Sequence, residues 1–305
     1  MSLVINHNLM AMNANRNLNA AYSALSTSTR RLSSGLRVNT AADDAAGLAV
    51  REIMRSEIAG LDQGIRNAND AISLIQTADG ALSVIDEKLI RMKELAQQAA
   101  TGTYTSDQRL IIDSEYQAMA SEITRIASST DFNGIHLLNG NLAGANSTHN
   151  GNGLVSTGPL KVHFGTGNDS AEDYYYISIG RATASALGLG HAAADKGGTG
   201  SAVSAGKTIS TQALAQASLD SLTKAIVSKD KIRASLGALQ NRLQNTISTL
   251  QIQAENTQAA ESRISDVDVA TEMTNFVRNQ ILTQSAVAML AQANSLPRMA
   301  LQLMS

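Results

Sequence analysis

The 305-residue sequence contains no cysteine, and this absence excludes disulfide bonds, thiolate metal sites and a cysteine nucleophile. Tryptophan is absent too, and only three phenylalanines and six tyrosines are present. Large aromatic side chains normally dominate the energetics of a compact core. Because alanine, serine, leucine, isoleucine, asparagine and glutamine prevail instead, the composition favours long helices that pack along narrow seams.

Basic runs and long apolar runs are also missing. The net charge is −2, the isoelectric point is about 6.2, and no block of five basic residues occurs, so there is no electrostatic case for nucleic-acid binding. No apolar stretch approaches the roughly 20 residues that span a bilayer, so we expect no membrane insertion. Residues 1–8 lack the basic and apolar regions of a secretory signal peptide, which by itself indicates a cytoplasmic protein.

Glycine divides the chain into three parts, because 13 of the 22 glycines fall within residues 141–206. The flanks are therefore compatible with long helices, and the middle is not. Both prolines, Pro159 and Pro297, lie outside the long helices that we expect. In the middle, residues 160–164 alternate apolar and polar types and residues 174–179 are aromatic and β-branched, which predicts one or two β-hairpins.

The first predicted helix covers about residues 15–36, where apolar residues recur every seven positions. Leu18, Leu25 and Leu32 form one series, and Tyr22 follows the first of them by four residues. This spacing is typical of a stripe that packs against another helix.

Three further helices are predicted in the N-terminal flank. One covers about residues 42–59, and a longer one covers about residues 65–100 with Gly102 as its C-terminal cap. The seam of the longer helix repeats every seven residues, at Leu82, Leu89 and Ala96 and at Ile85, Met92 and Ala99. A capping box from Thr105 to Gln108 begins the next helix, and the turn residues 131–134 end it.

The C-terminal flank repeats this pattern. One helix carries an apolar seam at Ile232, Leu236, Leu239, Leu243, Ile247 and Leu250. The last, over residues 266–293, has Val269, Met273, Phe276, Val277 and Ile281 on one face. We therefore predict a mainly α fold, in which both chain ends form long antiparallel coiled-coil-like helices, with a small β-hairpin region in the middle.

No constellation for catalysis or metal binding is present. Residues 201–208 miss a phosphate-binding loop because Ser201 stands where glycine is required, and we interpret them as a flexible linker. The five histidines lack metal-ligand spacing. The carboxylate pairs Asp43 with Asp44 and Asp266 with Asp268 stand at predicted helix starts, where they favour the helix dipole. Asn146 and Asn168 match the N-glycosylation pattern, and the serines and threonines of the middle are alternative glycan sites.

Longer motifs occur at both ends. Near the start they are residues 5–8 (Ile-Asn-His-Asn), 11–18, 32–39 (Leu-Ser-Ser-Gly-Leu-Arg-Val-Asn) and 41–48, followed by residues 130–134. Near the other end they are residues 263–272, 280–282 and 290–294. Together these motifs resemble bacterial flagellin, and the resemblance covers about residues 1–140 and 210–305.

The resemblance implies a division of the chain into three parts. Residues 1–44 with 263–305 would form inner core helices, and residues 45–140 with 207–262 would form a rod-shaped helical domain. Residues 141–206 would form a Gly-rich hairpin and loop segment of that rod domain. Since they number only about 65, we expect no separate outer domain.

The resemblance also implies a structural, non-enzymatic subunit without cofactors that assembles with identical copies into the flagellar filament for motility. Such a subunit leaves the cell unfolded through the flagellar secretion channel, which accounts for the missing signal peptide and implies an extracellular location. Its other expected partners are an export chaperone and the hook-associated and cap proteins. Its expected assembly residues are Leu18, Tyr22, Leu25, Leu32, Met273, Phe276, Val277, Ile281 and Leu290.

The terminal segments are not expected to order alone. The few seam side chains of the first helix bury too little apolar surface to offset the conformational entropy of ordering it. We therefore expect residues near 1–40 and 270–305 to be mobile in the monomer and to fold against neighbouring subunits in the filament.

The resemblance further implies recognition by a host Toll-like receptor. Residues 90–96 match the family's receptor-binding motif, with Lys93 where an arginine is often found. Arg91 and Leu95 are four residues apart, so we place them on one helical face, and Glu115 fits the third recognised position.

Three other interpretations were weighed. A hook–filament junction protein shares the paired terminal helices, but the unbroken motifs at 41–48 and 291–294 favour the filament subunit. An enzyme carried on a flagellin scaffold would need a longer middle with a metal or nucleophile motif. A cytoplasmic coiled-coil adaptor would be recovered only from the cytosol.

Overall fold

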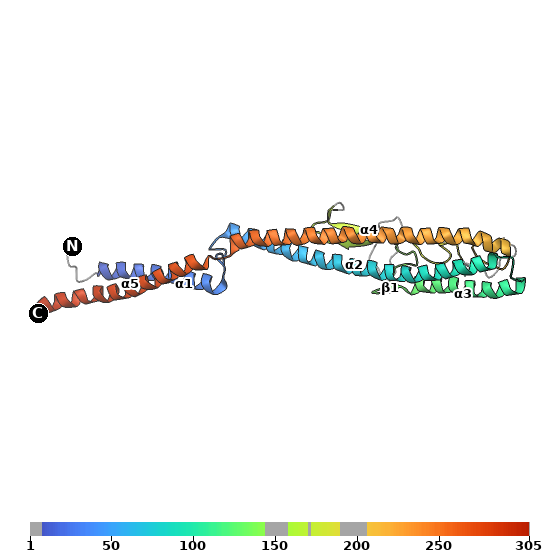
Figure 1. Ribbon diagram of the computed structural model, residues 1–305. Coiled ribbons are helices and arrows are strands. Elements are labelled where there is room, and N and C mark those ends of the chain that lie inside the picture. The colour runs from blue at the N-terminus through green and yellow to red at the C-terminus, as the bar shows by residue number, and fades with distance from the viewer. Residues whose placement is uncertain (1–7, 144–157, 170–171, 190–205, 305) are drawn as a thin grey trace. The chain divides into compact units, whose positions relative to one another are not determined.

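The computed structural model describes residues 8–143, 158–169, 172–189 and 206–304, and it is mainly helical (Figure 1). The helices of this part are α1 (Leu9–Ser34), α2 (Ala45–Ala100), α3 (Ser106–Ser129), α4 (Gln212–Ser265) and α5 (Val269–Met304). Two antiparallel hairpins are formed by β1 (Asp131–Phe132) with β2 (Ile135–His136), and by β3 (Leu160–His163) with β4 (Tyr174–Ile177). The predicted fold class is confirmed, including the β3–β4 hairpin in the middle of the chain.

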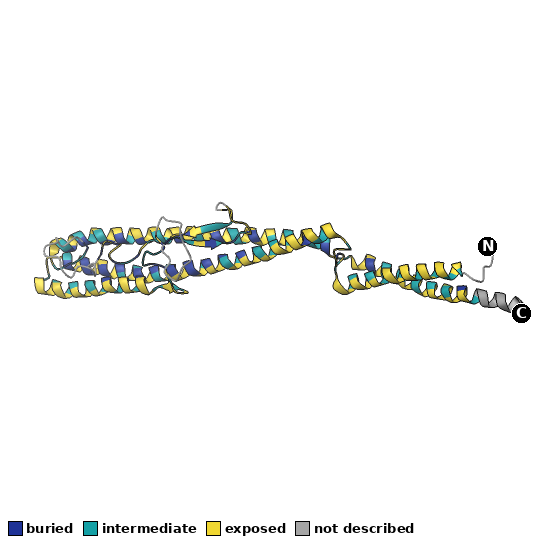
Figure 2. Ribbon diagram, turned by 180° about the vertical axis from the view of Figure 1, so that it is seen from behind, coloured by how far each residue is buried: buried dark blue, intermediate teal, exposed yellow. Residues whose placement is uncertain are grey.

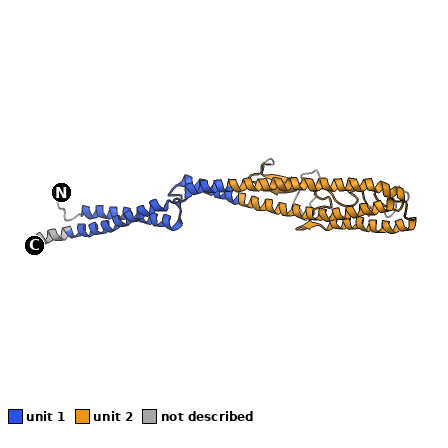
Figure 3. Ribbon diagram, in the orientation of Figure 1, with its two compact units in different colours: residues 1–59, 254–305 blue, residues 60–253 orange. Residues whose placement is uncertain are grey.

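The chain forms two compact units, which Figure 3 distinguishes. Unit 1 contains residues 1–59 and 254–305, and α1 and α5 pack against each other within it. Unit 2 contains residues 60–253, with α3 and α4 running along α2 and both hairpins beside them. Helices α2 and α4 each contribute residues to both units.

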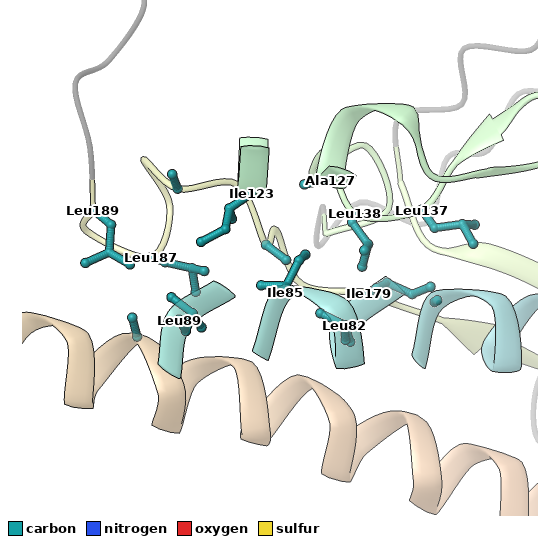
Figure 4. Close-up of a cluster of buried hydrophobic side chains, with 14 of the residues drawn as sticks. Leu82, Ile85, Leu89, Ile123, Ala127, Leu137, Leu138, Ile179, Leu187 and Leu189 are labelled. Atoms are coloured by element: carbon teal, nitrogen blue, oxygen red, sulfur yellow. The ribbon is translucent and has the colours of Figure 1, made fainter. Parts of the chain in front are cut away.

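The core of unit 2 follows the seven-residue repeat. Two series on α2 are buried, none of their members more than 4% exposed: Leu61, Ala68, Ile75, Leu82, Leu89 and Ala96, and Ala71, Ala78, Ile85, Met92 and Ala99. Residues of α3 and of the segments after both hairpins cover this face, and Figure 4 shows Leu82, Ile85 and Leu89 pointing toward Ile123 and Leu138. The hairpin segment thus shares one core with the long helices.

The predicted break between residues 59 and 65 is wrong, because α2 runs through it without interruption. The predicted bounds left Gly60 and Gly64 between two helices, and each glycine in a helix costs about 1 kcal/mol relative to alanine. Both glycines instead make room for the chain after β3. A Cβ at Gly64 would lie 1.9 Å from the Phe164 carbonyl oxygen, and one at Gly60 would lie 2.8 Å from Thr166. The Asn67 amide secures this approach by donating to the His163 carbonyl at 2.8 Å.

The turn between α2 and α3 confirms one prediction and corrects another. The capping box is present. The backbone N–H of Gln108 donates to Thr105 Oγ1 at 3.4 Å, and the backbone N–H of Thr105 donates to Gln108 Oε1 at 3.0 Å. Gly102 does not act as a left-handed cap, because its φ is not positive. The Arg109 guanidinium satisfies the end of α2 instead, donating to the Ala99 and Thr101 carbonyls at 2.9 and 2.8 Å.

The terminal helices extend beyond their predicted bounds. Asn8 caps α1 by accepting from the Ala11 N–H at 3.0 Å, and Gly35, with φ of 73°, closes its other end. Helix α5 continues past residue 293 to Met304, so Pro297 lies inside it. Proline removes one helical hydrogen bond, but residues 298–304 are rich in methionine, leucine and alanine, which are strong helix formers.

The β1–β2 hairpin was not predicted, because its residues were assigned only to the turn that ends α3. Asn133 and Gly134 both have positive φ, 51° and 80°, which is the geometry of a two-residue hairpin turn. The Asn-Gly pair is the sequence signal that identifies such a hairpin.

Candidate interaction surfaces

The terminal helix pair has almost no apolar core of its own. Among the described side chains of α1 and α5, only Ser28, Glu272 and Ala293 are buried. Figure 2 shows exposed residues over most of this pair, whereas buried positions gather along the helices of unit 2. Two helices that bury no large apolar side chain between them gain little from packing on each other.

The same two helices expose many large apolar side chains. These residues are Leu9, Met10, Met12 and Tyr22 on α1, and Val269, Met273, Val277, Ile281, Leu282, Val287 and Met289 on α5. On α5, four of them recur every four residues from Val269 to Ile281, so they form one exposed stripe. Contiguous exposed apolar surface of this kind marks an interaction site.

The predicted assembly residues divide into two groups. Leu18, Leu25, Leu32, Phe276 and Leu290 are half-buried. Tyr22, Met273, Val277 and Ile281 are exposed, Tyr22 by 65%. Tyr22 therefore does not share the half-buried face of the leucine series. The positions that complete this face are Ala21 and Ser28, three residues after Leu18 and Leu25.

A groove of about 900 Å³ runs between α1 and α5. From α1 it is lined by Met10, Asn13, Ala14, Asn17, Ala20 and Ala21, and from α5 by Leu282, Ser285, Ala286, Met289, Gln292 and Ala293. The five alanines of this lining leave space open, and its two methionines are adaptable apolar side chains. Sequence reasoning missed this groove, because periodicity identifies an apolar face but not the small residues that leave it unfilled.

Within unit 1, the segment that follows α1 is held to the segment between α4 and α5 by backbone hydrogen bonds, and to α2 by an arginine. The Arg37 N–H donates to the Ser265 carbonyl at 2.7 Å, and the Val267 N–H to the Gly35 carbonyl at 3.0 Å. The Arg51 guanidinium donates to the Val38 carbonyl at 2.8 Å. Unit 1 contains no lysine, since the eight lysines of the chain lie within residues 60–253.

Most of the acidic side chains of the two predicted carboxylate pairs accept hydrogen bonds at turns or helix starts. Asp43 accepts hydrogen bonds from the Thr40 N–H and hydroxyl, which lower the pKa of its carboxyl. Asp44 accepts from the Gly47 N–H at the start of α2. Asp268 begins α5, and its bonds from the Thr271 hydroxyl and N–H lower its pKa. Three of the four predicted carboxylates therefore lie at turns or helix starts, while Asp266 accepts from the Ser262 hydroxyl at the end of α4.

A second, polar surface lies across α2 and α3. Arg91 donates to Glu115 Oε1 from Nη2 at 2.9 Å and from Nε at 3.1 Å, and to Glu94 at 3.0 Å. The Glu115 bond is the main cause that raises the Arg91 pKa. Both side chains of the Arg91–Glu115 pair are nearly half exposed, and Ile111, one turn before Glu115, is 71% exposed.

The third residue predicted for this surface lies elsewhere. Leu95 is only 2% exposed and belongs to the core of unit 2. The seven-residue series places positions 92, 96 and 99 inward, and Leu95 lies beside them. The structure thus brings Arg91 and Glu115 together and leaves Leu95 beneath the surface.

Neither a metal centre nor a membrane span is found among the described residues. No group of three or more histidine, aspartate or glutamate side chains in this part could hold a metal ion. None of its helices is long and apolar enough to cross a membrane. His7, His149 and His191, and most of the loop-like residues 201–208, lie outside the described residues.

Known proteins match this chain in both of its helical flanks. The bacterial flagellin N-terminal helical region matches residues 5–143, and the C-terminal helical region matches residues 219–304. Flagellin FlaB2 of Treponema pallidum is 41% identical over 99% of this chain and 100% of its own length. Flagellin of Bacillus subtilis is 42% identical over 98% and 99%. The crystal structure of Bacillus cereus flagellin aligns with 64% of this chain and 94% of that one, at 27% identity and a TM-score of 0.45.

Proposed function

Because this chain belongs to the bacterial flagellin family, we propose that it assembles with identical copies into the flagellar filament that drives motility. The observation that carries the proposal is the exposed apolar surface of α1 and α5. Burying one large apolar side chain contributes roughly 1.5–3 kcal/mol. Several such side chains per subunit would stabilise contacts between copies far more than the pair stabilises itself.

The groove between α1 and α5 suits a contact that repeats along a fibre. The stripe on α5 and the groove are different surfaces, so a copy that places one against the other makes a heterologous contact. Heterologous contacts that do not close into a ring generate open helical assemblies. In this proposal residues 1–44 and 263–305 form the inner core, residues 45–140 and 207–262 the surrounding rod domain, and residues 141–206 a part of that domain.

We further propose that the subunit is exported unfolded through the flagellar secretion channel and functions outside the cell. The chain contains no cysteine, so no disulfide has to be opened for passage or formed afterwards. The partners of this route are an export chaperone and the hook-associated and cap proteins. No enzymatic activity belongs to the proposal.

Recognition by the host Toll-like receptor for flagellin is proposed through the Arg91–Glu115 pair, with Leu95 supporting the helix beneath it. Arginine is a frequent hot-spot residue at protein interfaces. Replacing Arg91 and Glu115 by alanine should raise the concentration needed for receptor signalling by about tenfold, or about 1.4 kcal/mol. Alanine at Arg125 and Glu122, another exposed ion pair, should leave signalling unchanged. Equal signalling by both double variants would refute this surface.

Filament formation is tested by heating the purified protein to dissociate it, cooling it, adding filament seeds and imaging the product by negative-stain electron microscopy. Long filaments of uniform width are the expected result. Monomers alone would contradict self-assembly, and short rings would indicate the hook–filament junction protein instead.

A further inference from the structure

One position in the core of unit 2 carries a charge. The residues of α4 that recur every seven positions are Ala215, Leu222, Lys229, Leu236, Leu243 and Leu250, and none is more than 7% exposed. Lys229 occupies a place where its neighbours in the series are leucines, and it is 1% exposed. A buried lysine loses its hydration, so its presence needs an explanation.

Lys229 is held by carboxylates on two helices. Its Nζ lies 2.6 Å from Asp86 Oδ1 on α2 and 2.7 Å from Asp230 Oδ1 on α4. One turn further along α4, the Arg233 guanidinium donates from Nε to Asp79 Oδ1 at 2.7 Å and from Nη2 to Asp79 Oδ2 at 3.2 Å. Two ion pairs therefore join α4 to α2 at neighbouring levels, and the numbering shows that the helices are antiparallel.

The apolar part of the seam does not select a single alignment of the two helices. Buried series with seven-residue spacing run along both α2 and α4. Sliding one helix by seven residues, about 10 Å at 1.5 Å per residue, again places apolar positions opposite apolar positions. A single polar residue in such a seam specifies register at some cost in stability.

The two ion pairs distinguish the observed register from its neighbours. A slip of seven residues in one direction brings Lys229 opposite Asp79 but leaves Arg233 opposite Ile72. The opposite slip brings Arg233 opposite Asp86 and Lys229 opposite Lys93. In the first alignment Arg233, which is partly exposed, loses its carboxylate. In the second, the buried Lys229 keeps Asp230 but loses Asp86 and faces a second cation, and removing a partner from a buried charge is strongly unfavourable.

We propose that Lys229 and Arg233, with Asp86 and Asp79, fix the register of α4 on α2. Replacing a buried ion pair by apolar side chains is often neutral or stabilising, so the pair contributes alignment rather than stability. If the chain also forms filaments as proposed above, a single register gives every subunit the same structure in unit 2.

The test measures the register in monomers, so it does not depend on filament formation. Because the chain lacks cysteine, spin labels can be placed at Ser83→Cys and Ser248→Cys, two exposed positions on α2 and α4 that lie at different levels along the helix pair. Pulsed electron paramagnetic resonance then gives the distance between the labels. In Lys229→Leu we expect at least two distance populations, displaced by about 10 Å, with the helical circular dichroism of the parent protein retained.

Two control variants define the outcome. Lys229→Arg keeps the cation, and Lys224→Leu removes an exposed lysine from the same helix, so both should show the single distance of the parent. A single parental distance in Lys229→Leu would overturn the proposal, as would loss of its helical circular dichroism. Failure of filament assembly by a parent protein with one distance would count against the proposed function and leave the register assignment intact.

Discussion

Gly64 and Gly80 show how much a single residue depends on its surroundings, since both lie within α2. A Cβ at Gly64 would lie 1.9 Å from the Phe164 carbonyl oxygen, whereas one at Gly80 would meet nothing within 4 Å. Glycine lowers helix stability by about 1 kcal/mol relative to alanine at either position. At Gly64 the lower helix stability is offset by the close approach of the chain after β3, which a side chain would block. At Gly80 no such contact exists.

Alanine at the two positions should therefore have opposite effects. Gly64→Ala forces the backbone at Phe164 away, and overpacking of this kind costs about 1–3 kcal/mol of the free energy of unfolding. Gly80→Ala should raise the free energy of unfolding by up to about 1 kcal/mol. Thermal unfolding followed by circular dichroism measures both. A stabilised Gly64→Ala variant would show that the hairpin does not rest on α2 at this point.

At the scale of the helix, the seven-residue spacing predicted the seams of α2 and α4, and the capping box predicted the start of α3. The same patterns failed where a distant segment decides the outcome. The predicted break fell at Gly60 and Gly64, where the missing side chains make room for Thr166 and Phe164. The four-residue spacing likewise placed Leu95, taken from the family motif, on one face with Arg91. The core of unit 2 encloses Leu95 instead.

The apolar surface of α1 and α5 was only partly predictable, because the contacts of one helix depend on the other. Apolar spacing named Met273, Val277 and Ile281, and these side chains are exposed. It could not reveal that α1 covers another face of α5, or that small residues such as Ala20 and Ala286 leave a groove between the two helices.

Two equally exposed valines, one on α5 and one on α4, allow an assembly contact to be distinguished from an ordinary exposed apolar residue. Val277 on α5 is 46% exposed and Val227 on α4 is 48% exposed. Val277→Ser should raise the critical concentration for filament formation by about tenfold, the effect of losing about 1.4 kcal/mol of apolar burial. Val227→Ser should leave it near the parental value. Sedimentation of polymer over a concentration series gives both numbers, and equal shifts would mean that the contact surface is not confined to the terminal helices.

At the scale of the whole molecule, the two units differ in how they are stabilised. Unit 2 encloses an apolar core shared by three helices and both hairpins, whereas the helix pair of unit 1 buries almost none of its large side chains. Local stability follows the density of buried contacts. The units should therefore open independently in a free subunit.

Hydrogen exchange should reveal this difference directly. In dilute monomer, amides of α1 and α5 should exchange rapidly while those of residues 68–99 are protected, because only the latter are covered by a core. In filaments, protection should extend to α1 and α5. Mass spectrometry of peptic fragments resolves these regions, and slow exchange of the terminal helices in monomer would argue against folding on assembly.

The confinement of lysine to residues 60–253 has a consequence for chemical labelling. Reagents that acylate lysine amines modify side chains only in that part of the chain, and leave the side chains of the terminal helices as they are. A dye, a biotin tag or an antigen coupled through lysine would thus attach within residues 60–253 and leave the side chains of the surface proposed for polymerisation unmodified. If the chain polymerises as proposed, this distribution suits it to carry coupled molecules along a filament.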